Sequence, residues 1–516
     1  MSLTLSLQRS MQLTPTKTAT IFGSRRRSFQ VYGERVARLA GALRALGMQP
    51  NERVGILALN SDRFLECVMA VWWAGGVLNP VNIRWSVPEI VYSLDDCDTR
   101  ILIVDDAFAP LAPRISATAR HAPLFIHADE DQTPVGMHAY EALIDAHDAV
   151  EDAGRGGDDL ACIMYTGGTT GHPKGVMQSH MNLWAAAVQR LAETPILRNS
   201  TALHVVPLFH IAGLGRIVMQ SIAGECQAVL PGFDARQVLE IIERDKVTDT
   251  VMVPTMIQAV LNHPDFHKFD LSSFKRLGYG ASPSASVMVE QAVRLLPHVE
   301  LSHAYGLTEA CPVVSSSGPA HHSEAARKSG LSRSAGLPAF GVLVRIVDAD
   351  GNEVPRGVVG EITARGPNIM LGYWNKPEET ARALRDGWLF TGDGGYMDAE
   401  GNLFIVDRIK DMIVSGGENV YSAEVENAIA QHPAVAMCAV IGIPHEKWGE
   451  AVHAVVVRKP GTELDEEAVR AHCRKLIASY KCPKTVVFRD ELPLSSAGKI
   501  LKRDLREPYW PRKAAV

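Results

Sequence analysis

The chain has 516 residues, of which 46% are hydrophobic and 21% are charged, and this composition excludes a disordered or fibrous protein. Since a domain averages about 150 residues, we expect two to four compact units. The 52 Lys and Arg residues against 58 Asp and Glu residues give a formal net charge of −6, which provides no general attraction to nucleic acids or acidic membranes.

The longest nearly unbroken apolar run, residues 67–78, is shorter than the ~20 residues of a membrane-spanning helix, and we interpret it as a buried helix. The amino terminus lacks the continuous hydrophobic region of a secretory signal. The eight cysteines stand far apart, without a CxxC pair or a zinc-binding spacing, which is typical of reduced core thiols. We therefore expect a cytoplasmic protein without membrane insertion, and homodimer formation stays open.

Strand and helix patterns alternate almost from the start, which predicts an α/β protein. Residues 53–59 (RVGILAL) have the pattern of a buried strand, and Ser61 offers an N-cap for an apolar helix that ends at Gly75 and Gly76. Similar strands are predicted at 249–254, 274–279 and 299–304. Ligands bind beyond the carboxyl ends of strands in open α/β sheets, so the sequences GYGAS and HAYGLTE, which end two of these strands, should share one crevice.

Near residue 350 the pattern changes to short, turn-rich segments that predict a β-rich part built of hairpins. We expect a domain boundary just after Asp407, with a large domain at 1–407 and a small α/β domain at 408–516. The small domain should contain strands near 436–443 and 451–458 and an amphipathic helix at 465–477.

The stretch 165–177 (YTGGTTGHPKGVM) has the composition of a phosphate-binding loop. Its glycines permit backbone N–H groups to turn toward a polyphosphate, its threonines add hydroxyl donors, and Lys174 adds a cation. It is not a Walker A loop, because Pro173 precedes the lysine and the sequence Gly-Lys followed by Ser or Thr is absent.

Six motifs, namely TGGTTGHPKG, PLFHIAGL, YGLTE, TGD, VDRIKDMIVSGGENVYSAEVE and PLSSAGKILKRDL, occur in an order and spacing that resembles the adenylate-forming superfamily, and the chain looks like an acyl-CoA synthetase. The resemblance spans nearly the whole chain and implies ATP, Mg²⁺ and coenzyme A as cofactors. It departs from the usual pattern at Gly167, where the family has a serine, so that one hydroxyl donor is missing and the backbone donors remain.

The resemblance implies a role for each motif. The phosphates of ATP would be held by Thr166, Gly167, Gly168, Thr169, Thr170 and Lys174. Thr308 would donate to phosphate, and Glu309 would bind Mg²⁺, a cation that prefers carboxylate and phosphate oxygens. The adenosine would lie among Gly280, Ala281, Ser282, Pro283, Tyr305 and Gly306, with its ribose hydroxyls on Asp393 and Arg408.

The same resemblance makes Lys499 the lysine of adenylation, whose cation would bridge the substrate carboxylate and the α-phosphate. Lys410 corresponds to the hinge at which the small domain changes orientation, and Gly416 and Gly417 would lie beside the pantetheine tunnel of the second orientation. A simple β-turn at these two glycines is equally compatible with the sequence.

We expect the acyl pocket to be formed by His210, Ile211, Gly213 and residues 253–255, 278–281 and 302–304, most of which are apolar or small. No acidic residue at 201–224 could neutralise the ammonium of an amino acid, and no tryptophan between Trp184 and Trp374 shortens the pocket for acetate. A fatty acid and an aryl acid both remain possible. An acid:carrier-protein ligase and a luciferase-like oxygenase are the alternative functions.

Overall fold

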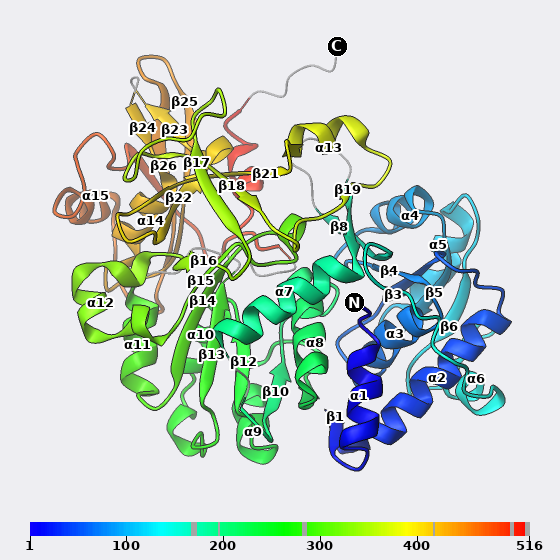
Figure 1. Ribbon diagram of the computed structural model, residues 1–516. Coiled ribbons are helices and arrows are strands. Elements are labelled where there is room, and N and C mark those ends of the chain that lie inside the picture. The colour runs from blue at the N-terminus through cyan, green and yellow to red at the C-terminus, as the bar shows by residue number, and fades with distance from the viewer. Residues whose placement is uncertain (167–172, 195–196, 281–285, 416–417, 496–499, 511–516) are drawn as a thin grey trace.

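The computed structural model describes residues 1–166, 173–194, 197–280, 286–415, 418–495 and 500–510. Figure 1 shows the first elements, in blue and cyan, beside the green elements of the middle of the chain. The yellow β-rich part and the orange-to-red C-terminal elements lie together above the green part (Figure 1). Within the described residues, no helix is both long enough and apolar enough to cross a membrane.

One sheet is built mainly from the first third of the chain, and its strands are parallel except at the β8, β9 and β19 end. In spatial order the strands are β19 (Gly372–Tyr373), β9 (Lys174–Ser179), β8 (Leu160–Thr166), β4 (Val77–Pro80), β3 (Arg53–Leu57), β5 (Thr99–Val104), β6 (Leu124–His127) and β7 (His138–Ala139). Its associated helices are α2 (Phe29–Ala45), α3 (Asp62–Trp73), α4 (Val87–Asp96), α5 (Ala112–Thr118) and α6 (Tyr140–Ala146).

A second sheet carries the central, parallel strands that lead to the predicted crevice. In spatial order its strands are β16 (Leu337–Pro338), β15 (Ser315–Ser317), β14 (Glu300–Tyr305), β13 (Arg276–Gly280), β12 (Asp249–Met252), β10 (Thr201–His204), β11 (Cys226–Val229), β1 (Thr18–Phe22) and β2 (Arg25–Ser28). The helices of this part are α7 (His180–Glu193), α8 (Ile211–Ala223), α9 (Ala235–Arg244), α10 (Pro254–Leu261) and α11 (Ser286–Leu295), and α1 (Leu5–Leu13) packs against α2 and α8.

The β-rich part is an antiparallel sheet of β17 (Leu343–Val347), β18 (Gly360–Arg365), β20 (Leu384–Arg385), β21 (Trp388–Met397) and β22 (Leu403–Arg408), with α13 (Pro377–Ala383) in its connections. α12 (Glu324–Ser329) lies between β15 and β16 of the second sheet. The C-terminal part contains β23 (Ile413–Ser415), β24 (Glu418–Val420), β25 (Val435–His445), β26 (Gly449–Arg458) and β27 (Thr485–Phe488), together with α14 (Ser422–Ala430), α15 (Glu466–Arg474) and α16 (Lys502–Arg506). Its apolar cores contain no residue that precedes Ile413, so this part buries its own side chains.

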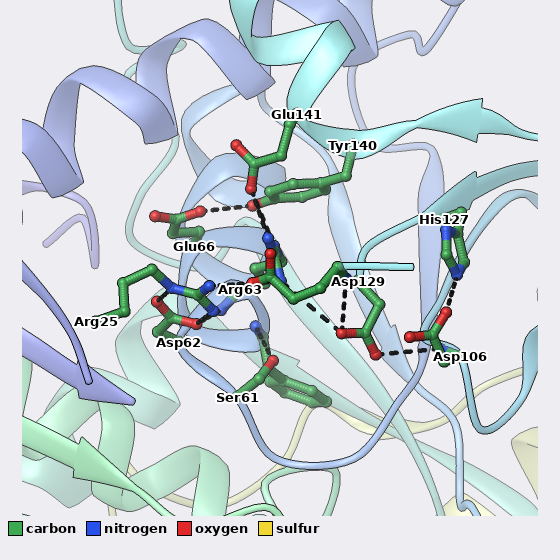
Figure 2. A network of polar contacts seen from close by, with 12 residues as sticks. Arg25, Ser61, Asp62, Arg63, Glu66, Asp106, His127, Asp129, Tyr140 and Glu141 are labelled. Carbon is green, nitrogen blue, oxygen red and sulfur yellow. Dashed lines mark hydrogen bonds and ion pairs between the residues drawn. The ribbon is translucent and has the colours of Figure 1, made fainter. Parts of the chain in front are cut away.

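A buried ionic cluster ties the two large sheets together (Figure 2). Arg25 and Arg27 lie on β2 at the edge of the second sheet, whereas Asp62 and Glu66 lie on α3, which packs with the first. Arg25 donates to both oxygens of Asp62 at 2.7 Å, and Arg27 pairs with Asp62 and with Glu66. We call these residues, together with Arg35, Arg63, Glu130, Tyr140 and Glu141, the inter-sheet cluster.

The elements predicted from local pattern largely exist in the structure. Ser61 caps α3 by accepting a hydrogen bond from the backbone N–H of Phe64 at 3.1 Å, and the segments near 250, 276 and 300 are β12, β13 and β14. The interpretation of residues 67–78 as one helix is wrong. The helix ends at Trp73, Gly75 turns the chain with a φ of +88°, and β4 begins at Val77, because buried helices and buried strands are equally apolar.

Candidate active site

A cavity of about 1310 Å³ opens at the carboxyl ends of β13 and β14, where the crevice was predicted. Residues from most predicted motifs line it together, namely Thr166, Lys174, His210, Gly280, Gly306, Thr308, Glu309 and Arg408. These residues come from the two large sheets and from the last strand of the β-rich part. The fold therefore brings distant segments of sequence to one cavity.

Asp393, Arg408 and Tyr305 form a hydrogen-bonded group, of which Arg408 lines the cavity. Asp393 and Arg408 are paired in the register of β21 and β22, and Arg408 Nε lies 2.7 Å from Asp393 Oδ1. Tyr305 donates its hydroxyl to Asp393 Oδ2 at 2.7 Å. Burial, reinforced by Asp393, raises the pKa of Tyr305 well above its usual range, and Asp393 raises the pKa of Arg408. The group presents a fixed carboxylate beside a cation.

The polyphosphate side of the cavity combines Thr166, Lys174 and Glu309. Thr166 and Lys174 are paired in the register of β8 and β9, at the two ends of the glycine-rich loop. Thr308 and Glu309 lie in the 3-10 turn Thr308–Ala310, where Gln178 Nε2 donates to the carbonyl oxygen of Thr308 at 2.8 Å. These contacts fix the backbone that presents hydroxyl, carboxylate and ammonium groups to the cavity.

Tyr373 connects two of these groups and was not expected from the sequence. Its hydroxyl donates to Glu309 Oε1 at 2.8 Å, and its ring lies with its centroid 5.0 Å from Lys174 Nζ. Burial raises the pKa of Tyr373, and Glu309 adds to this shift, so the phenol stays a donor at neutral pH. Only the pairing of β19 with β9, at Tyr373 and Val176, brings this side chain to the phosphate loop.

The donor set fits a magnesium ion that arrives with its substrate. Among the residues that the structure describes, no group of three or more His, Cys, Asp and Glu side chains could hold a metal by itself. Mg²⁺ bound with nucleotides typically takes one or two protein carboxylates and completes its shell with phosphate oxygens and water. Glu309 supplies one such carboxylate on the cavity wall.

The residues around His210 line the part of the cavity where the acyl pocket was expected, and we call this part the acyl chamber. His210 is the N-cap of α8, and its Nδ1 accepts the backbone N–H of Ala212 at 3.4 Å. Of the residues expected in the acyl pocket, those that line the cavity are His210, Ile211, Val253, Gly278, Tyr279, Gly280, Ser302 and Ala304. Gly213 instead packs on the backbone, because a Cβ there would lie 2.3 Å from the carbonyl oxygen of Pro207. Its expected place in the pocket is wrong.

Several predicted site residues lie outside the described residues, namely Gly167, Gly168, Thr169, Thr170, Ala281, Ser282, Pro283, Gly416, Gly417 and Lys499. Lys410 lies in the 3-10 turn Ile409–Asp411 that directly follows β22. The described residues on both sides of 496–499 line the cavity, including Ser495 and Leu501, and Arg84 donates to the carbonyl oxygen of Ser495 at 3.1 Å. The C-terminal part thus borders the site.

Comparison with known proteins agrees with this geometry. Residues 7–374 match the family described as AMP-binding enzyme, and residues 424–499 match the AMP-binding enzyme C-terminal domain. A feruloyl-CoA synthase of Amycolatopsis sp is 40% identical over 503 residues, which cover 97% of this chain and 98% of the relative. A fatty acid–acyl-carrier-protein ligase of Streptomyces coeruleorubidus is 34% identical over 510 residues, which cover 96% of this chain and 94% of that protein.

Among solved structures, an anthranilate CoA ligase in complex with anthranoyl-AMP superimposes with a TM-score of 0.91 at 28% identity, covering 99% of this chain and 97% of that one. The chain therefore belongs to the AMP-binding enzyme family, and the resemblance inferred from six motifs is confirmed. The predicted fold class, α/β with a β-rich part and a small C-terminal part, is confirmed as well.

Proposed function

We propose that this protein is an AMP-forming carboxylic acid:CoA ligase that activates an aryl or fatty acid as its acyl adenylate and transfers the acyl group to coenzyme A. The observation that carries the proposal is one cavity with three kinds of lining. Arg408, which pairs with Asp393, lines it together with Lys174 and Glu309, and so do the mainly small or apolar residues near His210. The relatives support it, because many of them are named as ligases of acids and CoA.

In the first half-reaction the side chains bind and orient two anionic substrates. Asp393 accepts the ribose hydroxyls, while Thr166 and Lys174 hold the β and γ phosphates. Mg²⁺ on Glu309 would neutralise part of the polyphosphate charge. The acid needs no general base, because its carboxylate is ionised at neutral pH and attacks the α-phosphorus directly. Lys499 stabilises the negative charge that develops there, and pyrophosphate leaves.

For the second half-reaction we propose that the small domain, residues 408–516, rotates about Lys410 and brings Gly416 and Gly417 to the pantetheine arm. The thiol then attacks the acyl carbonyl and releases AMP. The separate apolar core of the C-terminal part supports movement as a unit. A location in the cytoplasm and assembly as a homodimer stay predictions.

Substrate assays test the proposal. We expect exchange of pyrophosphate into ATP with apolar aryl or fatty acids, and formation of acyl-CoA and AMP once coenzyme A and Mg²⁺ are supplied. Release of ADP and orthophosphate instead would refute the ligase assignment. Transfer only to a phosphopantetheinyl carrier protein would favour the carrier-protein alternative, and oxygen uptake without acyl-CoA formation would favour the oxygenase.

Two variants test the rotation. Lys499→Ala should lose adenylate formation by about 10²-fold or more, the usual cost of removing one charge-stabilising donor, and should still make thioester from supplied acyl adenylate. Gly417→Leu should behave inversely, because a bulky side chain obstructs the pantetheine path without touching the nucleotide side. Equal loss of both half-reactions in both variants would refute the two-orientation mechanism while leaving the ligase activity possible.

A further inference from the structure

The acyl chamber has a floor of three strands whose residues form rows in register. Val251, Gly278 and Ser302 form the middle row of β12, β13 and β14. Toward the carboxyl ends the next row includes Gly280 and Ala304, and toward the amino ends it is Asp249, Arg276 and Glu300. Four residue steps separate Gly280 from Arg276, which corresponds to roughly 13 Å of strand. The floor is thus small and apolar near the nucleotide and charged at its far end.

Two helices, α7 and α8, also line the chamber, and their lining residues show the same change from small to charged. α8 starts at the nucleotide end and lines the chamber with Ala212, Gly215, Arg216 and Met219, which share one helical face. α7 contributes Ala186, Ala187 and Arg190 in the same way. Gly215 and Gly278 also line the cavity, and a Cβ there would lie 3.1 Å from Pro312 Cδ and 2.9 Å from Val251 Cγ2, respectively. Beyond these small residues the lining changes to guanidinium groups.

Each arginine at the far end has a carboxylate partner. Arg216 pairs with Asp249 and donates to its backbone oxygen at 3.2 Å, and Arg276 Nε lies 2.9 Å from Glu300 Oε2. Arg190 Nη1 lies 3.2 Å from Glu193 Oε2. Three cations thus face three anions, so the far end has no net charge to offset the desolvation of another ionised group. A neutral polar group fits it better than a second carboxylate.

Arg190 shares its carboxylate partner with two other donors. Its partner Glu193 also accepts hydrogen bonds from Ser316 Oγ and from the backbone N–H of Phe340 at 3.3 Å. Arg190 itself donates one hydrogen bond within the described part of the chain, and Glu193 accepts it. The side chain of Arg190 is 16% exposed and lines the cavity. A guanidinium has five N–H donors, so Arg190 retains donors for an oxygen that enters the chamber.

We propose that Arg190 hydrogen-bonds a neutral oxygen at the end of the acid remote from its carboxylate, so that the preferred substrates are elongated aryl acids with a ring hydroxyl or ether oxygen. This inference rests on the proposed ligase function and narrows its substrate class. An unsubstituted hydrocarbon acid would instead leave the remaining N–H donors of Arg190 without an acceptor.

The test compares acids of nearly equal size. The acid-dependent exchange of pyrophosphate into ATP is measured with 4-hydroxycinnamate, 4-methylcinnamate and 4-carboxycinnamate, and kcat/KM is compared between acids. We expect the hydroxy acid to exceed the methyl acid by about ten- to a hundredfold, the range for a hydrogen bond to a charged group. Arg190→Met should reduce the ratio of kcat/KM between the hydroxy and the methyl acid to about threefold or less. It should do so by lowering kcat/KM for the hydroxy acid alone.

Arg276→Met is the matched control, because it removes another far-end arginine and should leave the ratio unchanged. A merely structural role of Arg190 would lower the rates with both acids together, which the ratio separates. Three outcomes would overturn the proposal. The unmodified enzyme could show similar kcat/KM values for the hydroxy and methyl acids, or it could prefer 4-carboxycinnamate. The hydroxy-to-methyl ratio could also fall in Arg276→Met but not in Arg190→Met. Exchange with none of the aryl or fatty acids would instead refute the ligase function itself.

Discussion

The inter-sheet cluster and the nucleotide end of the cavity are both rich in opposite charges, and they use them differently. In the cluster, Asp62 is 1% exposed and accepts from Arg25 and Arg27, so its charge is neutralised within the fold. At the cavity, Asp393 is 7% exposed but its partner Arg408 is 45% exposed. The cluster is complete without a ligand, whereas the cavity keeps charge that faces solvent.

This difference in exposure distinguishes charged residues that stabilise the fold from charged residues that we propose bind substrate. A buried carboxylate between buried cations lies in a region of low dielectric constant, and removing it leaves cations without compensation. A cation at an open mouth keeps its hydration and loses little when its partner is removed. Whether the ion-pair partner of a carboxylate is buried, rather than how many ion pairs it makes, therefore indicates whether the carboxylate is structural or available to a ligand.

The largest effect on stability should come from Asp62→Ala in the inter-sheet cluster. The substitution leaves the buried guanidinium of Arg27 with Glu66 as its remaining carboxylate partner and removes the two hydrogen bonds from Arg25 to Asp62. Breaking such a buried pair typically costs about 3–5 kcal/mol. Urea unfolding measures the loss. Glu130→Ala is the matched control, because Glu130 is 64% exposed and should cost less than about 1 kcal/mol. Equal losses in the two variants would contradict the distinction.

At the cavity, Asp393→Asn should impair function and spare stability. The amide keeps one acceptor oxygen, but the charge opposite Arg408 and the second acceptor are lost, so kcat/KM for ATP should fall by about ten- to a hundredfold. The melting temperature should stay close to that of the unmodified protein because Arg408 remains hydrated. A large drop in melting temperature would place Asp393 with Asp62 as a structural residue.

Much of the fold follows from local sequence. The strand at Arg53–Leu57 and its cap at Ser61 were predictable because buried strands and helix caps depend on neighbouring residues. The end of that helix near Gly75 was predictable too, because glycine readily adopts the positive φ that ends a helix. The strand that begins at Val77 was not, because apolar character continues across the turn. The motifs that line the cavity were predictable through the resemblance, and the structure brings Thr166, Glu309 and Arg408 to one cavity.

The residues that sequence reasoning missed depend on pairing over long distances. Tyr373 reaches Glu309 only because β19 pairs with β9, and nothing in its own neighbourhood indicates that pairing. Arg190 and Arg216 interrupt apolar helices, where a charged residue usually indicates a solvated face. Here the two helices pack so that these side chains line a cavity, and only the three-dimensional arrangement distinguishes the two cases.

The cluster also predicts sensitivity to acid. Burial alone would raise the pKa of Glu141, but Arg35 and Arg63 outweigh it and lower the pKa below its ordinary value of 4.5. A lowered pKa stabilises the fold above pH 4.5, and this contribution disappears as the pH falls through the folded-state value. Glu141→Gln should therefore cost up to about 1 kcal/mol at pH 7 and less at pH 3, measured by urea unfolding at both pH values. An equal cost at both would contradict the assignment.

The smallest effect should come from Tyr373→Phe, which tests how the cavity orients Glu309, the carboxylate that we propose binds Mg²⁺. Phenylalanine keeps the ring near Lys174 and removes only the hydroxyl that donates to Glu309 Oε1. Without that donor Glu309 loses its fixed orientation, so the KM for MgATP should rise by about threefold, or about 0.7 kcal/mol, with kcat nearly unchanged. Tyr373→Leu, which also removes the aromatic face beside Lys174, should raise the KM further. If Tyr373→Phe leaves the MgATP dependence of pyrophosphate exchange unchanged while Glu309→Gln weakens it, the carboxylate acts without help from the phenol, and the hydroxyl belongs with the interactions that stabilise the fold.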